Sequence, residues 1–378
     1  MIRHTTTPRN HWQQAVEQLG FGFHTSDLPY WDESVYYQFS LAEVESIELA
    51  TATLWDLCLQ ACERIIAEKR YDQLAIPPHM VALIERSWEE EHPSIYGRFD
   101  LCVRPDGGIK LLEFNADTPT SLFEAAIVQW FWLQDFDKSK DQFNSIHEKL
   151  IAYWRYLRNY LHTGPMHFAC VKESLEDLTT TEYLRDCAIQ AGLSTELVFI
   201  EDIGWNANDE CFVDMKERQI HNLFKLYPWE WLAREEFGQV LGQDRPQAFF
   251  IEPAWRMLLS NKGILALLWE YFPGNELLLP AYFSADRLQG DYVRKPLLGR
   301  EGANVQLLRQ GQVQAFTEGG YGAEGYVFQQ LHALPEFSGQ YPVIGSWMVG
   351  QEPAGMGIRE ADQLITTNTS RFVPHLIG

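Results

Sequence analysis

The stretch RFDLCVRPDGGIKLLEFNAD, residues 98–117, constrains the fold more than any other part of the sequence. Apolar residues alternate with polar ones on both sides of Asp106-Gly107-Gly108. An Asp-Gly pair between two such runs is a strong local signal for a turn between antiparallel strands. The stretch therefore predicts a β-hairpin. Segments with helical spacing stand before and after it, so the chain must combine helices with antiparallel strands.

Several other segments carry apolar residues at the spacing of one helix face. The longest predicts a single helix over residues 46–72. Residues 1–45 lack such a pattern and are expected to form an irregular, aromatic-rich arm. Further helices are expected over residues 78–90, 120–134, 141–160 and 259–271.

Strand patterns become common toward the C-terminus. HFACV (167–171) and LVFI (197–200) predict short buried strands, and a helix near residues 180–191 between them indicates a βαβ-like unit. Residues 222–232 and 248–255 are aromatic-rich and are expected to form strands or loops. The mixture indicates the α+β class, with an antiparallel share in the C-terminal part. Strands are expected there within 292–308, 325–331, 342–349 and 355–360.

Charge and composition limit the function classes. The formal net charge of -22 argues against a nucleic-acid scaffold, which usually needs a basic face. An acidic surface suits a cationic partner such as a polyamine, although solubility explains it equally well. The beginning, MIRHTTTPRNHWQQ, has no apolar core of a signal peptide, and no run of about 18 apolar residues predicts a membrane span. The six cysteines form no CxxC pair, so we expect a cytoplasmic protein with reduced thiols.

The hairpin carries the first candidate site. Asp100 and Glu113 stand on its two strands, and Glu113 and Asn115 are two residues apart, so they project from the same face. Two carboxylates and an amide oxygen make a hard oxygen site that suits magnesium with bound phosphates. Arg98 shares the face of Asp100 and could reach a transferring phosphate or an oxyanion. The alternative is a surface hairpin with ordinary ion pairs.

A second candidate set is cationic. Lys295 leads into a loop in which Gly299 and Gly302 bracket Arg300, and glycines permit close approach to phosphate oxygens. Lys262 stands at the expected start of a helix, where Ser260 or Asn261 could cap it and where anions are favoured. The segment matches neither GxGxxG nor the Walker pattern. An exposed lysine beside a helix cap remains the alternative for Lys262.

Arg359 is a third candidate, because Gly355 and Gly357 before it suggest a backbone that approaches something closely. A strand bulge with a surface arginine is the alternative. Residues 117–121, DTPTS, could cap the following helix or place hydroxyls on a substrate carboxylate. Nucleophilic hydrolysis is not supported, since GxSxG is absent and no cysteine has a nearby candidate base in the sequence. We expect His167, His221 and His332 to be structural.

Four long motifs give the sequence a specific resemblance. GRFDLCV…KLLEFNADTPTSLFEAAIVQWFW, EPAWRMLLSNKGILALLWEYFPGNELLLPAYF, KPLLGREGANV and GSWMVGQEPAGMGIREADQLITTNTSRFVPH resemble the synthetase domain of the glutathionylspermidine synthase family. The similarity runs from about residue 30 to the C-terminus. It implies an ATP-grasp fold with a circularly permuted order, in which the nucleotide lies between two α+β lobes. It also implies one unit over residues 1–378, with a substrate-side subdomain at about 165–245 and a nucleotide-binding part at about 250–378.

The resemblance also implies a role for each matching residue. Asp100, Glu113 and Asn115 become magnesium ligands, and Arg98 stabilises the transferring phosphate. Arg300 and Arg359 become further contacts to phosphate or to the reacting carboxylate. The remaining matches concern the cofactor ATP: Lys262 and Lys295 on the phosphates, Gly299 and Gly302 in the loop beside them, and Gln329 and Gln330 in the segment that lines the adenine.

The reaction that the resemblance implies is an ATP-dependent ligation of a carboxylate to an amine through an acyl phosphate. The partners would be a small-molecule acid and amine, with glutathione and spermidine as one pair and a different acid and amine as another. A nucleotide-binding regulator of the same fold without turnover is the alternative from another class. The chain is too short for the amidase domain of the bifunctional family members, so hydrolysis of the conjugate is not expected. The oligomeric state stays open.

Overall fold

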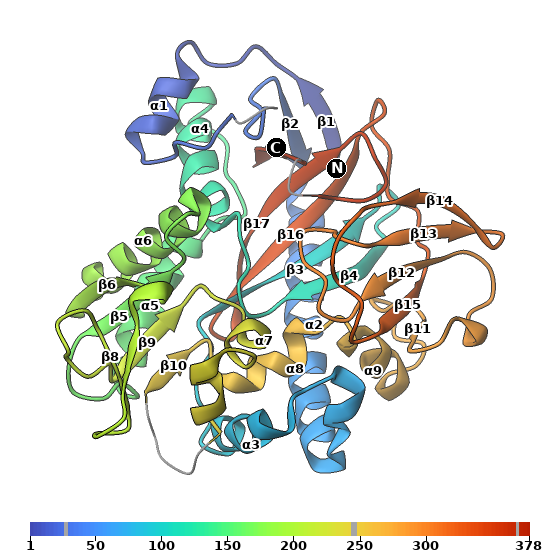
Figure 1. Cartoon of the computed structure of the whole chain (residues 1–378). Helices are drawn as coiled ribbons and strands as arrows, with labels where there is room; N and C mark the ends of the chain where they lie inside the picture. The colour runs from blue at the N-terminus through green and yellow to red at the C-terminus, as the bar shows by residue number, and fades with distance from the viewer. Residues whose placement is uncertain (26–28, 243–247, 368–369) are drawn as a thin grey trace.

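The predicted hairpin forms one side of a five-stranded antiparallel sheet in the order β18-β17-β16-β3-β4. The computed structural model describes residues 1–25, 29–242, 248–367 and 370–378. In the hairpin, Arg98 lies opposite Asn115 and Asp100 lies opposite Glu113. We call this sheet the hairpin sheet (Figure 1). Its strands are β3 (Tyr96–Val103), β4 (Ile109–Asn115), β16 (Tyr341–Val349), β17 (Glu352–Ala361) and β18 (Arg371–Val373).

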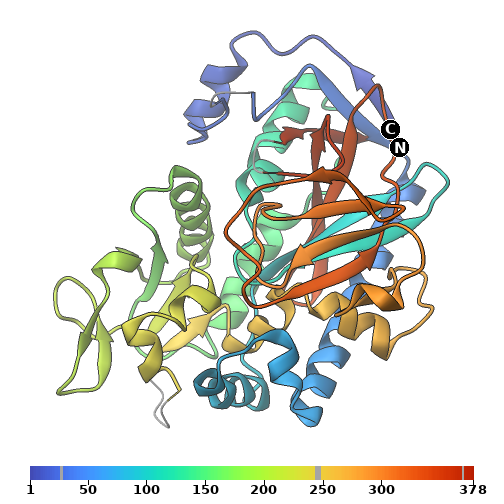
Figure 2. The same cartoon turned by 45° about the vertical axis from the view of Figure 1, so that its right-hand side comes forward.

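A second five-stranded sheet, which we call the lysine sheet, has the order β11-β15-β12-β13-β14 and is antiparallel throughout. It lies beside the hairpin in both views (Figures 1 and 2). The predicted strand, loop and strand over residues 292–308 is confirmed as β12 and β13. The strands are β11 (Ala281–Tyr282), β12 (Tyr292–Pro296), β13 (Gln306–Arg309), β14 (Gln312–Phe316) and β15 (Tyr326–Gln330).

The third sheet is parallel and has the order β10-β9-β5-β6. Helix α6 (Leu175–Gln190) joins β5 to β6, which confirms the predicted βαβ unit. This part of the chain stands on the opposite side of the hairpin from the lysine sheet (Figure 1). The parallel strands are β5 (Met166–Cys170), β6 (Thr195–Phe199), β9 (Asn222–Lys225) and β10 (Phe249–Ile251), and a small hairpin of β7 (Gly204–Asn206) and β8 (Cys211–Val213) follows β6.

The expected long helix exists but begins earlier. Helix α2 (Leu41–Glu68) starts after Ser40, whose side chain accepts from the Glu43 amide while Glu43 bonds back to the Ser40 amide. This capping box satisfies amides that the first turn would leave unpaired. The other expected helices are present within shifted bounds: α3 (Val81–Glu89), a π-helical turn (Glu124–Val128) continued by α4 (Gln129–Phe136), and α5 (Ile146–Leu157).

Three expectations about local structure are wrong. Residues 1–45 are not an irregular arm, since β1 (Ile2–Thr5), α1 (Trp12–Gln18) and β2 (Val35–Phe39) form there and β2 pairs with β19 (His375–Ile377). Because β2 pairs with a strand at the other end of the chain, the surrounding sequence carries no hairpin pattern that would predict it. Residues 259–271 form two helices, α8 (Met257–Ser260) and α9 (Ile264–Tyr271), because the Asn261 side chain bonds to Leu74 O at 2.6 Å and to Gly263 N at 2.8 Å. Within 222–232, α7 (Trp229–Leu232) is helical rather than strand or loop.

No helix in the described ranges is long and apolar enough to cross a membrane. Two hydrophobic clusters fill the interior of the described part of the chain. One packs α2 against the hairpin sheet and α9 against α2 and the lysine sheet, and the other packs α5 and α6 against the parallel sheet. Side chains on β3 and β4 that face away from these clusters are therefore available for a site.

Candidate functional site

The hairpin brings Asp100, Glu113 and Asn115 together, as predicted. The amide Nδ2 of Asn115 lies 3.0 Å from Asp100 Oδ2 and 3.4 Å from Glu113 Oε1. Cross-strand pairing explains this contact, because Asp100 and Glu113 are register partners and side chains two residues apart share a face. The three polar side chains converge on one point of the hairpin sheet.

Arg98 is fixed beside this point. Its Nε and Nη2 donate to the two carboxylate oxygens of Asp100 at 2.6 and 3.1 Å, and its Nη1 donates to Thr120 O at 2.6 Å. The neighbouring strand β16 leaves room for the arginine only because residue 345 is glycine: a Cβ there would lie 2.7 Å from Arg98 Cδ. Burial raises the pKa of Asp100 although Arg98 opposes this, and the acid pairs directly with the guanidinium.

Two lysines from separate elements act on the charge of Glu113. Lys262, in the turn between α8 and α9, places Nζ 3.0 Å from Glu113 Oε2. Lys295, on β12, donates to Leu112 O and Gln329 Oε1, each at 2.8 Å. Burial would raise the pKa of Glu113, but the two lysines lower it to about 2, so the carboxylate stays ionised. Burial lowers the pKa of Lys295 to about 8, although Glu113 opposes this.

The donor chemistry at the hairpin fits a hard divalent cation. Two carboxylates and one amide oxygen are ligands that magnesium prefers. Asn115 now turns its NH2 toward both acids, so a cation would require the amide to rotate and present Oδ1. Among the residues that the structure describes, no group of three or more His, Cys, Asp or Glu side chains could hold a metal ion. The three converging hairpin side chains include only two of these types, Asp100 and Glu113. They become a candidate metal site when the amide oxygen of Asn115 is counted as the third donor, as the sequence predicted.

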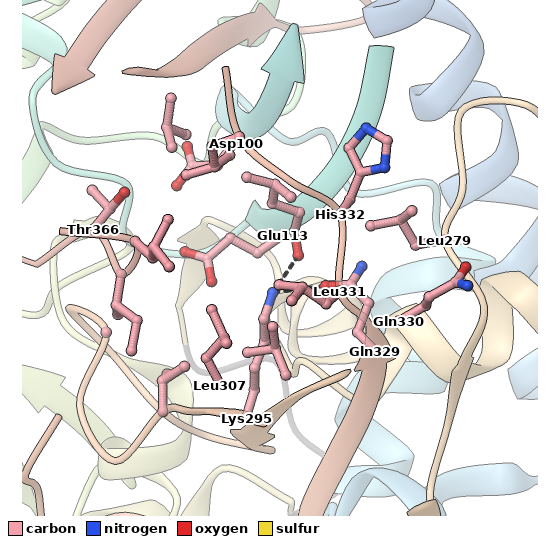
Figure 3. Close-up of a pocket in the computed structure, with 18 residues that line it drawn as sticks. Asp100, Glu113, Leu279, Lys295, Leu307, Gln329, Gln330, Leu331, His332 and Thr366 are labelled. Atoms are coloured by element: carbon pink, nitrogen blue, oxygen red, sulfur yellow. Dashed lines mark hydrogen bonds between the residues drawn. The ribbon is translucent and has the colours of Figure 1, made fainter. Parts of the chain in front are cut away.

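An apolar pocket opens between the hairpin sheet and the lysine sheet (Figure 3). Asp100 and Glu113 enter it from β3 and β4, and Lys295 and Gln329 enter it from β12 and β15. Gln330 and Gly302 also line it, as does His332, which was expected to be structural only. The apolar wall comes from residues scattered along the chain: Leu112, Leu279, Val293, Val305, Leu307, Leu331, Leu334, Val343, Leu364 and Ile365.

A charged pocket adjoins the apolar one, and Asp100, Glu113, Gly302 and Thr366 line both. All twelve residues predicted for the site line at least one of the two pockets. Thr118 and Thr120 were expected only as candidate helix caps or substrate contacts, and no sequence pattern pointed to Glu301, Thr366 or Thr367 as site residues. Besides the four shared residues, the charged pocket is lined by Arg98, Asn115, Ala116, Asp117, Thr118, Thr120, Ser260, Lys262, Gly299, Arg300, Glu301, Arg359 and Thr367.

The glycines before Arg359 do approach other groups closely, but these belong to the protein. A Cβ on Gly357 would lie 2.5 Å from Phe372 Cζ, and one on Gly355 would lie 2.9 Å from Phe143 O. A register shift at Trp347/Met348 leaves Ala354, next to Gly355 on β17, without a partner, so the strand carries the bulge that the alternative interpretation expected. Arg359 nevertheless lines the charged pocket and donates to Thr367 O at 2.6 Å.

One cysteine does have a base nearby in the structure, contrary to the expectation from the sequence. Cys187 Sγ lies 3.7 Å from His147 Nδ1. The pair is no nucleophile, however, because the thiol is buried and burial raises its pKa to about 12. His167 is buried beside Asp214 at 3.8 Å and lines neither pocket, in keeping with a structural role.

Comparison with known proteins gives matches along the whole chain. A family profile described as glutathionylspermidine synthase preATP-grasp matches residues 3–378. A Haemophilus influenzae protein that carries the provisional name acid–amine ligase is 43% identical over 95% of this chain and 96% of its own length. Trypanothione synthetase from Crithidia fasciculata is 29% identical over 84% of this chain, and the match spans 53% of that longer protein.

A solved structure supports the fold. A glutathione synthetase-like effector from Globodera pallida superposes with a TM-score of 0.57, covering 91% of this chain and 89% of its own. Sequence identity is 10%, so this likeness concerns the fold alone. The several sheets, the helices between them and this neighbour agree with an α+β architecture of the glutathione synthetase kind.

Proposed function

The chain belongs to the glutathionylspermidine synthase family, and from this premise we propose that it joins a carboxylate to an amine through an acyl phosphate made from ATP. The family is one of ATP-dependent acid–amine ligases, and the fold is of the ATP-grasp type. The permuted order is part of the proposal: the acidic hairpin, residues 96–115, precedes Lys262 and Lys295 along the chain.

The observation that carries the proposal is the meeting of the two pockets at Glu113. On one side lies a wall of leucine and valine with Gln329 and Gln330, which suits a purine base. On the other side Lys262, Arg98, Arg300 and Arg359 face a small polar space, which suits phosphate oxygens. A nucleotide with its base in the apolar pocket would therefore direct its phosphates toward the hairpin acids.

The residues of the charged pocket account for the proposed chemistry. A carboxylate becomes a good electrophile when it receives the terminal phosphoryl group of ATP, and an amine then attacks the carbonyl and expels phosphate. Positioning and charge neutralisation are the main needs of phosphoryl transfer. Arg98, already held by Asp100, would stabilise the negative charge on the phosphoryl group during its transfer. Arg300 and Arg359 would orient the reacting carboxylate. Magnesium held by Asp100, Glu113 and Asn115 would supply charge neutralisation to the phosphate oxygens.

The substrates are a finer part of the proposal. The family name suggests glutathione as the acid and spermidine as the amine, and an acidic protein suits a cationic amine. We propose that residues of about 165–245 form the substrate side and those of about 250–378 bind the nucleotide. The boundary near 245 falls outside the described residues. A cytoplasmic location stays a prediction.

An inactive regulator of the same fold is the weaker candidate. Loss of catalysis usually removes at least one charged group from a site, whereas Arg98, both hairpin acids, Asn115 and both lysines are all present and line the two adjoining pockets. This completeness favours turnover.

The test is phosphate release from ATP and magnesium with a panel of acids and amines that begins with glutathione and spermidine. We expect release that requires both an acid and an amine, and a product whose mass equals acid plus amine minus water. Omitting the amine or adding a chelator should return release to background. Background release across the whole panel, from a chain that still binds ATP, would favour the regulator.

A further inference from the structure

Helix α7 ties the parallel sheet to the loops that cover the charged pocket. It follows β9 and lies between the parallel sheet and the lysine sheet (Figure 1). Glu230 on α7 accepts from Arg300 Nη1 at 3.1 Å, and Arg234, just beyond α7, pairs with Glu324. Arg300 stands in the loop between β12 and β13, and Glu324 stands in the loop between β14 and β15. We call these two ion pairs the α7 bridge.

A buried ion pair next to the hairpin fixes the position of α7. Asp117 and Lys225 form an ion pair of 2.7 Å in which neither side chain is exposed by more than 1%. The second carboxylate oxygen of Asp117 accepts from the amide of Trp229, the first residue of α7, at 2.8 Å. Asp117 follows the hairpin directly, so the helix is anchored to the segment that carries the candidate metal ligands. A buried pair of this kind holds its neighbours in one arrangement, because either charge alone would be costly.

Arg300 closes a ring of contacts with the same segment. Its Nη1 meets Glu230 and its Nη2 meets Thr118, which is next to Asp117. Its guanidinium also lies 5.8 Å from the centre of the Trp231 ring. Two hydrogen-bond partners from different segments fix the plane of an arginine far better than one surface ion pair does. Glu230 is only 8% exposed, so solvent cannot easily take its place.

The two loops that contact α7 are connected to each other by hydrogen bonds. Asn304 N donates to Glu318 O at 3.3 Å, and its side-chain amide lies 3.2 Å from the Tyr326 hydroxyl. A hold on either loop is therefore transmitted to the other. Gly299, Arg300, Glu301 and Gly302 in the first loop all line the charged pocket, so these loops form one wall of the space proposed for the phosphates.

We propose that Glu230 is a positioning residue for Arg300, and that the α7 bridge holds both loops over the bound nucleotide until product release. The inference rests on the proposed function, since it assigns to α7 the control of that same site. Enclosure matters there because an acyl phosphate that meets water is hydrolysed before an amine reaches it. Closure of the two loops over the nucleotide would thereby be coupled, through α7, to the parallel sheet that we propose as the substrate side.

A cross-link tests the bridge without touching the pocket. The six native cysteines are all buried, whereas the side chains of Arg234 and Glu324 are 55% and 18% exposed. The double variant Arg234→Cys/Glu324→Cys is treated with a short bismaleimide after loading with a fluorescent ADP analogue and magnesium. We expect release of the analogue, chased by excess ATP, to slow by about tenfold or more relative to either single variant treated in the same way.

Release from the bridged protein at the rate of the single variants would overturn the inference while leaving the proposed function standing. A wild-type chain that binds no analogue would overturn both, so the two failures are distinguishable.

A second measurement addresses Glu230 itself. Glu230→Ala should speed release of the analogue by about tenfold and Glu230→Gln by about threefold, because glutamine keeps an acceptor but loses the charge. Both should raise the share of ATP hydrolysed without amide formation, which a purely structural role would not change. Glu236→Gln, an exposed acid shortly after α7, is the matched control and should behave as wild type. Unchanged release and unchanged coupling in Glu230→Ala would contradict the positioning role.

Discussion

The apolar pocket and the charged pocket share a wall but are built in opposite ways. The apolar pocket takes its surface from ten leucine, valine and isoleucine residues spread from Leu112 to Ile365, and shape decides what fits there. The charged pocket takes its groups from six short stretches of the chain, and most of its charges already have a partner. Packing specifies the first pocket and preorganised charge specifies the second. Substitutions in the two pockets should therefore fail in different ways.

The largest effect is expected on the charged side. Glu113→Gln keeps the shape of the side chain but removes one carboxylate from the candidate metal site and from the pair with Lys262. Turnover should fall by about a thousandfold while ATP still binds, because electrostatic stabilisation acts mainly on the transition state. Phosphate release and equilibrium binding of ATP, measured on the same sample, separate the two quantities. Turnover within a few-fold of wild type would remove Glu113 from the proposed metal site.

Lys295→Ala changes the apolar pocket next to Glu113, the carboxylate that lines both pockets. Its ammonium bonds to Leu112 O and Gln329 Oε1, so the change removes a charge and also frees the glutamine that faces the apolar pocket. We expect ATP affinity to fall by about 10- to 100-fold, since a charge-assisted bond to phosphate is worth about 1.5–3 kcal/mol. Isothermal titration at low and high ionic strength gives the measurement. A loss that does not depend on salt would mean that the lysine acts through packing.

Leu331→Ala makes the matching change on the apolar side. The residue is partly buried, so the fold should tolerate truncation, and ATP affinity should fall by only about three- to tenfold. The effect should be the same at all salt concentrations and should leave the magnesium requirement unchanged. If Leu331→Ala instead altered the magnesium dependence of turnover, the division between a shape-selecting and a charge-selecting pocket would be wrong.

The smallest expected effect is a drift with pH. Burial lowers the pKa of Lys295 to about 8, so its positive charge is present below that pH and is lost as the pH rises through it. ATP affinity should decline above about pH 8, at most tenfold per unit for a single proton. Lys295→Arg provides the control, because a guanidinium stays charged and its affinity should not change over the same range. An equal decline in both proteins would assign the titration to another group.

The charged pocket could be predicted from the sequence better than the apolar one, for a physical reason. Asp100, Glu113 and Asn115 meet through one hairpin, and the two-residue period of a strand with an Asp-Gly turn determines that meeting. Lys262, Lys295, Arg300 and Arg359 required the family resemblance, since their segments are far apart along the chain. The roles of all these residues remain predictions, although their positions are as expected.

The apolar pocket and the α7 bridge were outside the reach of local patterns. The wall residues Leu279, Leu307 and Val343 look like ordinary core residues in the sequence, because their pocket exists only after two sheets meet. The contact between Glu230 and Arg300 spans 70 positions and depends on a buried pair that anchors a four-residue helix. The pairing of β2 with β19 was missed for the same reason.

Gly345 has a practical consequence for anyone who maps this site by mutation. It has no side chain and is buried in the middle of β16, so a survey of polar residues would pass over it. Yet a single added methyl group would push Arg98 away from Asp100 and Thr120. Gly345→Ala should thus inactivate the enzyme although it changes no polar side chain. It would serve as an inactive control that alters neither the titratable groups nor the net charge.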